Sequence, residues 1–183
     1  MIFWSEPKKK YSIIYADPPW HYNARNNPTS TKFGFGASGH YPVMKTEEIC
    51  QLPIEKISDD DCALLLWTTW PRMEDALKVM RSWGFRYVTL GFIWIKTNKD
   101  GSPWFGVGYY AKSNTEPCLL GIRGKMKPIS NMVSQVVMGQ RGRHSQKPDI
   151  VRDKIVELFG DVPRIELFAR ERVPDWDAWG NEV

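Results

Sequence analysis

The sequence predicts an α/β fold in which a mostly parallel β-sheet carries helices on both faces. The first observation is a short apolar run, Tyr11–Ala16, that ends abruptly at an Asp-Pro-Pro-Trp turn. The second is that two further apolar runs, Cys62–Thr68 and Phe85–Lys96, flank a helical pattern over 71–83. The third is a late amphipathic helix over 148–159 that lies between two more apolar runs. Strands that alternate with helices are typical of a parallel, helix-covered sheet.

The elements of the first half have recognisable boundaries. Thr46 precedes two glutamates, so we expect it to cap a short helix. Pro71 suits the first turn of the next helix, and Gly84 suits its end. The positions expected on the inner face of that helix are Met73, Ala76, Leu77 and Met80. Asn98–Gly101 is a turn signal after the third strand.

The second half repeats this pattern. Glu116–Arg123 is predicted as a strand, and Arg164–Arg170 as the last strong strand. Between them, Pro148–Phe159 is predicted as a helix that Gly160 ends. The positions expected on its inner face are Ile150, Val151, Ile155, Leu158 and Phe159.

The size and charge of the chain limit its class. The 183 residues, 42% hydrophobic, are enough for one domain over 1–183 with a full core. A net charge of +4 fits a nucleic-acid partner. Cys50, Cys62 and Cys118 have neither disulfide-framework nor zinc-site spacing, so we expect no metal and a reducing compartment. No apolar run is long enough to span a bilayer, and we therefore expect a soluble, cytoplasmic protein with no membrane partner.

The turn Asp17-Pro18-Pro19-Trp20 suits one kind of chemistry. The lone pair of an exocyclic nucleobase amine is delocalised into the ring, so the amine is a weak nucleophile. The Asp17 carboxylate and the Pro18 carbonyl can each accept one of its N–H bonds and localise that lone pair. Pro18 and Pro19 restrict the direction of the carbonyl, and Trp20 offers a face for an unstacked base. The structural alternative is an Asx-Pro turn whose Trp belongs to the core.

Three loops are candidates for substrate contact. Residues 21–42 contain Gly34–Gly39, which matches GxGxxG by letter but lacks the strand and helix of a dinucleotide site, so we interpret these glycines as hinges of a lid. Residues 104–110 are either a second substrate loop or a hairpin packed on the sheet. Residues 125–147 contain no acidic residue and are the strongest candidate for phosphate contact. The alternative for 21–42 and for 125–147 is a solvated loop. The substrate-facing candidates in and beside these loops are His21, Asn23, Arg25, Lys32, Tyr109, Lys112, Arg141, Arg143 and His144.

Several motifs occur in a characteristic order. Asp17–Trp20 comes first, His144-Ser145-Gln146-Lys147-Pro148 and a helix follow, and Ile165–Arg170 and Trp179–Glu182 come last. In this order the chain resembles, from Tyr11 onward, the DPPW class of S-adenosylmethionine-dependent adenine methyltransferases. Eukaryotic members of that class methylate mRNA adenosine at N6, and bacterial and phage relatives resemble them. The resemblance implies a Rossmann-like methyltransferase fold in permuted order, with the catalytic motif before the cofactor strand.

The resemblance also implies roles for individual residues. Asp17 and Pro18 match the pair that holds the amine, with Pro19 and Trp20 completing the catalytic motif. The residues that match the family's S-adenosylmethionine contacts are Asp17, Lys147, Glu166, Phe168, Arg170, Asn181 and Glu182. Two departures are visible: only ten residues precede the first strand, and Thr115 stands where some relatives have lysine.

The expected function is methylation of the N6 amine of adenine in nucleic acid, with DNA favoured over RNA and a bacterial or phage source. The target adenine must be flipped out of a duplex or be single-stranded. A homodimer or a partner subunit is left open. The alternatives are a catalytically inactive nucleic-acid-binding subunit, methylation of RNA adenosine, and methylation of a cytosine or small-molecule amine.

Overall fold

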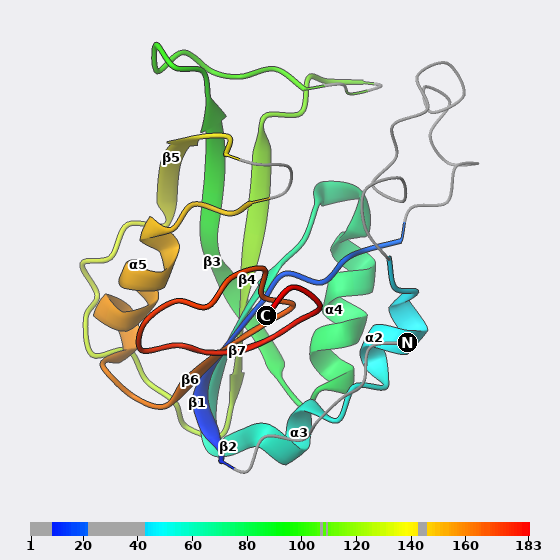
Figure 1. Ribbon diagram of the computed structural model, residues 1–183, viewed down its shortest axis with the longest axis vertical. Coiled ribbons are helices and arrows are strands. Elements are labelled where there is room, and N and C mark those ends of the chain that lie inside the picture. The colour runs from blue at the N-terminus through cyan, green and yellow to red at the C-terminus, as the bar shows by residue number, and fades with distance from the viewer. Residues whose placement is uncertain (1–8, 22–42, 107, 109, 143–145) are drawn as a thin grey trace.

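A seven-stranded sheet forms the centre of the molecule. The computed structural model describes residues 9–21, 43–106, 108, 110–142 and 146–183. The strands run in the spatial order β5-β3-β4-β2-β1-β6-β7 (Figure 1). Their bounds are β1 (Tyr11–Ala16), β2 (Ser58–Trp67), β3 (Arg86–Thr97), β4 (Thr115–Arg123), β5 (Val136–Gln140), β6 (Arg164–Leu167) and β7 (Asp177–Trp179).

The sheet is mostly parallel, which confirms the predicted fold class. Strand β1 is parallel to both of its neighbours, β2 and β6, and the pairs β6–β7 and β3–β5 are parallel too. Strand β4 is the exception, because it is antiparallel to β2 and to β3. The chain returns from β3 to β4 without the crossover helix that a parallel pair requires, so the simple alternation of strand and helix fails at this point.

Helices cover both faces of the sheet, as predicted. On one face lie α2 (Thr46–Cys50), α3 (Ile54–Ile57) and α4 (Met73–Ser82), and on the other lies α5 (Ile150–Phe159) (Figure 1). Along β1, Ile14 points to the first group of helices and Ile13 to α5, since successive side chains leave opposite faces. Burial on both faces explains why β1 appears in the sequence as a run that is apolar except for Ser12.

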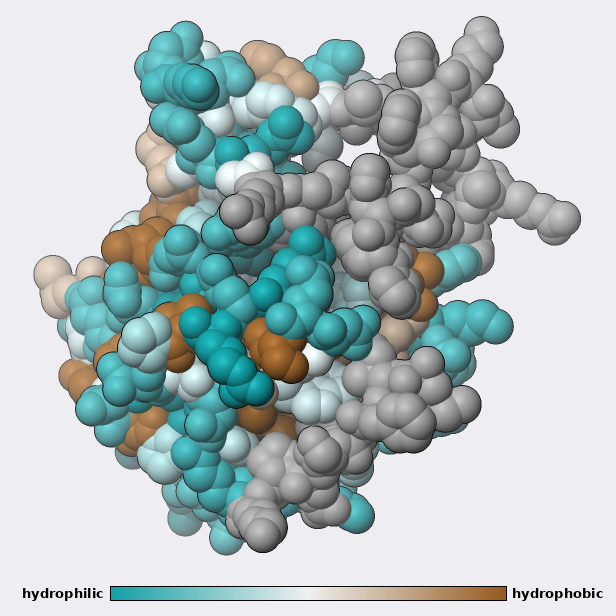
Figure 2. Space-filling model, in the orientation of Figure 1, coloured by the Kyte–Doolittle hydropathy of each residue, from teal (hydrophilic) through white to brown (hydrophobic). Residues whose placement is uncertain are grey.

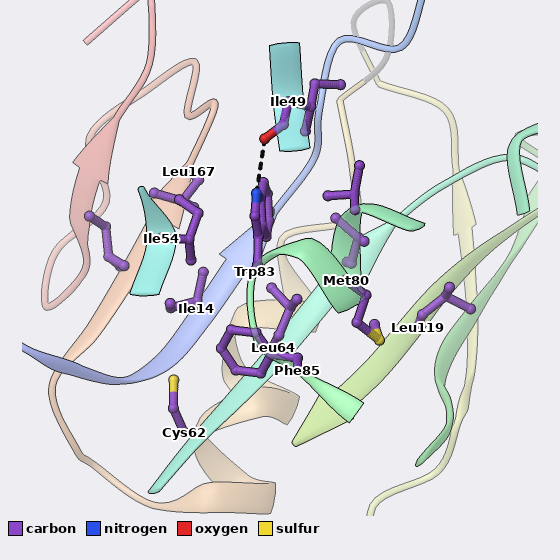
Figure 3. Packing of buried hydrophobic residues seen from close by; sticks show 14 of the residues in the cluster. Ile14, Ile49, Ile54, Cys62, Leu64, Met80, Trp83, Phe85, Leu119 and Leu167 are labelled. Atoms are coloured by element: carbon purple, nitrogen blue, oxygen red, sulfur yellow. Dashed lines mark hydrogen bonds between the residues drawn. The ribbon is translucent and has the colours of Figure 1, made fainter. Parts of the chain in front are cut away.

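The core under α2–α4 is shown in Figure 3. Trp83 is fully buried there, and its indole N–H donates to the carbonyl of Ile49 at 2.9 Å, which ties the end of α4 to α2. The predicted capping role of Thr46 is wrong: the N-cap is Lys45, whose backbone N–H donates to the Glu48 carboxylate at 2.7 Å. The Thr46 hydroxyl instead donates to Asp75 of α4 at 2.9 Å.

Two further expectations need correction. Strand β5 lies inside 125–147, which the sequence indicated as a loop. Its sequence, VVMGQ, leaves Val136 and Met138 exposed and buries Val137, so it lacks the continuous apolar character of the inner strands. Ile150, expected on the inner face of α5, is 48% exposed because it occupies the first turn of the helix.

Among the residues that the structure describes, none of the helices combines the length and the apolar character needed to cross a bilayer.

Candidate active site

Asp17 directly follows β1, an inner strand of the sheet. It therefore lies at the end of the sheet where the carboxyl ends of the parallel strands β1, β2 and β6 meet. Ala16, the last residue of β1, is level with Leu66 of β2 and with Leu167 of β6. This edge is where open α/β sheets bind their ligands. The turn after Asp17 is fixed by its own backbone, because the N–H of Trp20 donates to the Pro18 carbonyl at 2.9 Å.

A chain of buried charges begins at Asp17. The Lys147 ammonium lies 2.7 Å from Asp17 Oδ2 and 3.4 Å from Glu116 Oε2, and Lys96 donates to the other oxygen of Glu116. The four residues come from the end of β1, the segment before α5, the start of β4 and the end of β3. The Lys147 ammonium also lies 5.6 Å from the centroid of the Trp67 ring, a cation–π distance.

Burial and charge act in opposite directions on these groups. Burial raises the pKa of the Asp17 carboxyl, and the ion pair with Lys147 offsets this only in part. Burial also acts to raise the pKa of Glu116, but Lys147 and Lys96 outweigh it, and the pKa of Glu116 is lowered. Burial alone would lower the pKa of Lys147, but Asp17 and Glu116 together raise it. Lys147 therefore remains charged between its two carboxylates.

Two acceptors at this corner have room for a further hydrogen bond, as far as the described residues show. Lys147 engages Oδ2 of Asp17, and no described residue donates to Oδ1. The Pro18 carbonyl accepts one bond from Trp20, and a carbonyl oxygen has a second lone pair. The arrangement can therefore receive two N–H donors from one amine, as the sequence led us to expect.

Two predicted cofactor residues, Phe168 and Arg170, follow β6 close to Asp17. Phe168 follows β6 directly, has a backbone φ of +62°, and packs edge-to-face on Trp179 with ring centroids 5.4 Å apart. A positive φ at a bulky residue stores strain, which proteins tend to retain at functional sites. The Arg170 guanidinium is close enough to act on the charge of Asp17, and its Nε lies 4.0 Å from the Glu182 carboxylate. Asn181 lies beside Glu182 and is exposed.

Glu166 has a partner that the sequence analysis missed. Arg152 of α5 donates from Nε to Oε2 of Glu166 at 2.7 Å and from Nη2 to Oε1 at 3.2 Å. Burial raises the pKa of Glu166, and Arg152 opposes this. The carboxylate is thus oriented from the α5 side before any ligand binds.

Trp20 does not have the open face that its predicted stacking role requires. It is 5% exposed, belongs to the core under α2–α4, and donates its indole N–H to the Trp67 carbonyl at 3.2 Å. The structural alternative, a Trp that belongs to the core, describes this position.

The described substrate candidates occupy different environments. Arg141 is exposed, and its guanidinium carbon lies 3.9 Å from the centroid of the Trp104 ring. Lys112 is exposed, and His21 is half-buried with its backbone N–H bonded to the Met44 carbonyl. Asn23, Arg25, Lys32, Tyr109, Arg143 and His144 lie outside the described residues.

Three charged residues of the site were absent from the predicted set. Lys96 and Glu116 stand at the ends of otherwise apolar strands, and a charge in such a run is a signal, because buried charges are usually paired. Arg152 gives no comparable signal, since an arginine one residue from the apolar face of a helix is ordinary.

Comparison with known proteins supplies the context for this geometry. The profile of the MT-A70 family matches residues 11–182. The Type II methyltransferase M.MunI of a Mycoplasma species is 38% identical over 196 residues, covering 100% of this chain and 82% of the relative. An N(6)-adenosine-methyltransferase MT-A70-like protein of Arabidopsis thaliana is 25% identical, covering 94% of this chain and 24% of the relative. The N(6)-adenine-specific methyltransferase METTL4 of Homo sapiens is 27% identical, covering 96% of this chain and 38% of the relative.

Proposed function

This chain belongs to the MT-A70 family, and we propose that it transfers a methyl group from S-adenosylmethionine to the N6 amine of adenine in nucleic acid. The observation that carries the proposal is the Asp17 corner. Lys147 holds one oxygen of the Asp17 carboxylate, no described residue donates to the other, and the adjacent Pro18 carbonyl is held by the Trp20 N–H. DNA is the favoured substrate, because the identity to the Type II methyltransferase exceeds that to relatives named for adenosine.

The residues around Asp17 fit the charges of S-adenosylmethionine. Lys147 and Arg170 are cations that suit the carboxylate of its methionine part, and Asp17 suits the ammonium. Glu182 and Glu166 are acceptors for ribose hydroxyls, and Phe168 offers a ring beside the adenine. Asn181 adds an amide for the same end of the molecule. When bound, the cofactor would supply an electrophilic methyl group at this corner.

The role of the chain is to orient the amine. Oδ1 of Asp17 and the Pro18 carbonyl would each accept one N–H of the adenine amine and direct its lone pair toward the methyl group. Asp17 need not be a strong base, since the nitrogen becomes acidic only after it gains the methyl group. Lys147 limits the negative charge that Asp17 presents and fixes the orientation of its carboxylate.

The proposal is tested by offering labelled S-adenosylmethionine to DNA and RNA side by side and identifying the methylated nucleoside after digestion. We expect N6-methyladenine from DNA. Label in cytosine, in a small molecule or nowhere would contradict the proposed activity. If the chain bound the cofactor and nucleic acid but transferred no methyl group, it would be the catalytically inactive subunit. The presence of Asp17 argues against that role.

Asp17→Ala should abolish transfer and leave the dissociation constant of the cofactor within about tenfold, because Lys147, Arg170 and Glu182 remain. Cofactor titration by calorimetry and the transfer assay measure the two effects separately. Asp153→Ala is the matched control, an exposed aspartate on the outer side of α5. Transfer by Asp17→Ala at a rate near that of the wild type would overturn the assignment of Asp17.

A further inference from the structure

Trp70 is an exposed aromatic residue at the same sheet edge as Asp17. It begins the 3₁₀ turn Trp70–Arg72, three positions after the end of β2, and is 50% exposed. Its indole N–H donates to the hydroxyl of Thr115, the first residue of β4, at 2.8 Å. The polar atom of the side chain is therefore satisfied within the protein, and the orientation of the ring is fixed while much of its surface stays in water.

Trp70 continues into an apolar row across the sheet. Thr115 is level with Ile95 of β3, and Ile95 is level with Met138 of β5. Met138 is 65% exposed, and Val136, two positions earlier on the same face, is 46% exposed. Figure 2 shows tan and brown atoms where β5 lies in Figure 1, with hydrophilic atoms beside them. Exposed apolar side chains thus lie at both ends of the row, Trp70 at one and Val136 and Met138 at the other, with half-buried Ile95 between them.

The row lies next to the reacting corner, but on the other face of the sheet. Thr115 and Glu116 are consecutive strand residues, so their side chains point to opposite faces. Glu116 shares Lys147 with Asp17, whereas Thr115 holds Trp70. The Thr68 N–H donates to the Pro117 carbonyl at 3.0 Å, so the start of β4 meets the end of β2 at the sheet edge that also carries Asp17. A nucleic-acid strand that crosses this edge can present one base to Trp70 and another to Asp17.

The charge at this edge of the sheet suits a polyanion. No acidic residue occurs between residues 125 and 147, the stretch that contains β5. Arg141 follows β5 directly, and its guanidinium carbon lies 3.9 Å from the centroid of the Trp104 ring. Lys96 approaches the same ring at 5.7 Å, so the Arg141 cation lies on the Glu116 face of the sheet, across the edge from the row. Stacking through its face leaves the N–H groups at its edge directed outward, where a phosphate can accept from them. Unpaired bases stack on aromatic and apolar side chains, and phosphates bind cations. Trp70 and Arg141 offer one group of each kind at this edge of the sheet.

We propose that Trp70 stacks on a base that flanks the target adenine in the substrate strand, with Ile95 and Met138 extending this surface and Arg141 contacting the backbone. This inference rests on the proposed function and specifies how its nucleic-acid substrate is held. Stacking holds the strand open beside the flipped base, so its contribution belongs to substrate binding and not to methyl transfer itself.

The test compares Trp70→Ala and Trp70→Phe with Tyr87→Ala, using a DNA oligonucleotide in which the methylated adenine has been identified. Tyr87 is 43% exposed near the other end of β3, so it is a matched exposed aromatic residue away from the site. We expect Trp70→Ala to raise the KM for DNA about tenfold or more, with the cofactor dissociation constant unchanged within twofold. Trp70→Phe should restore most of the affinity, and Tyr87→Ala should match the wild type.

A second readout reports stacking directly. With 2-aminopurine placed next to the target adenine, binding to the wild type should quench its fluorescence, and Trp70→Ala should lose that quenching. Thr115→Val, which keeps the indole but removes its anchor, should give an intermediate KM. This variant carries the test if Trp70→Ala fails to fold, as judged by its thermal melt.

Two results would overturn the inference. One is a KM for Trp70→Ala, or for Thr115→Val if the first variant does not fold, equal to that of Tyr87→Ala. The other is a change in the oligomer mass of the Trp70 variant, measured by light scattering, with an unchanged KM for DNA. That result would make the row an interface between protein chains. The variants are compared only after the wild-type protein has been shown to produce N6-methyladenine in DNA. Failure of the proposed function would therefore be detected before, and separately from, failure of this inference.

Discussion

At the scale of single residues, the site depends on four charges that neutralise one another away from water. Lys147 and Lys96 alternate with Asp17 and Glu116, and each of the four side chains is at most 24% exposed. A buried pair of this kind adds little net stability, but removing one partner leaves an uncompensated charge in a medium of low dielectric. The chain of charges therefore fixes geometry, which is what the orientation of an amine requires.

The pH dependence of the stability of Glu116→Gln should show how strongly these four charges depend on one another. The pKa of Glu116 is lower in the folded protein than in the unfolded chain, so its charge stabilises the fold above the unfolded pKa of about 4.3. That contribution is lost as the pH falls through the folded pKa. We expect the variant to lower the free energy of unfolding by about 3 kcal/mol at pH 7, and the difference to shrink below about pH 4.

Urea denaturation of both proteins from pH 7 down to pH 3.5 measures this difference. Glu157→Gln, an exposed glutamate on α5, should show little difference at any pH. A constant effect of Glu116→Gln across the whole range would mean that the loss is one of packing and not of charge.

At the scale of elements, the sequence predicts what depends on local pattern and misses what depends on pairing between distant segments. Apart from Ser12, the residues of β1 are buried on both faces, as are Cys62–Trp67 of β2, so their apolar runs identify these strands. Strand β5 is an edge strand with one open face, and its pairing with β3 alone makes it a strand. The direction of β4 is likewise set by its neighbours and leaves no mark in its own residues.

The same distinction applies to the site. Asp17 and Lys147 were each predicted to contact ligand, because motif order identifies such positions. Their 2.7 Å contact with each other joins segments 130 positions apart, and no local pattern encodes it. Trp20 is buried in the core under α2–α4 and donates to the Trp67 backbone carbonyl, so its burial is a tertiary property as well.

The end of α5 offers a test of an element boundary. Gly160 has φ +89° and ψ 174°, a region that is almost exclusive to glycine. Gly160→Ala should therefore lower the free energy of unfolding by about 1–3 kcal/mol. Gly139→Ala in β5 is the control, because an added Cβ there meets no atom closer than 3.6 Å and the backbone has no positive φ. Chemical denaturation compares the two, and an equal cost at both positions would contradict the backbone argument.

At the scale of the whole molecule, the carboxyl ends of the central strands and the most basic stretch of the chain lie at the same edge of the sheet. The carboxyl ends of β1, β2 and β6 provide the Asp17 corner and its approach, and the acid-free stretch 125–147 reaches the same edge through Lys147. A net charge of +4 is modest, so its distribution matters more than its size. We therefore expect specific cations, and not the overall charge, to control binding of the substrate.

The salt dependence of DNA binding by Arg141→Gln tests whether the position of a cation matters more than the net charge. Each phosphate contact adds roughly 0.9 to the slope of log affinity for duplex DNA against log salt concentration, because binding releases a condensed counterion. Arg141→Gln should reduce that slope by about one unit, and Arg141→Lys should preserve it, since the charge is kept. Arg81→Gln, which removes an exposed cation from the last turn of α4, should leave the slope unchanged. Fluorescence anisotropy across a salt series measures all four proteins. If Arg81→Gln flattened the slope as much as Arg141→Gln, binding would follow net charge, and the β5 edge would have no special part in holding the strand.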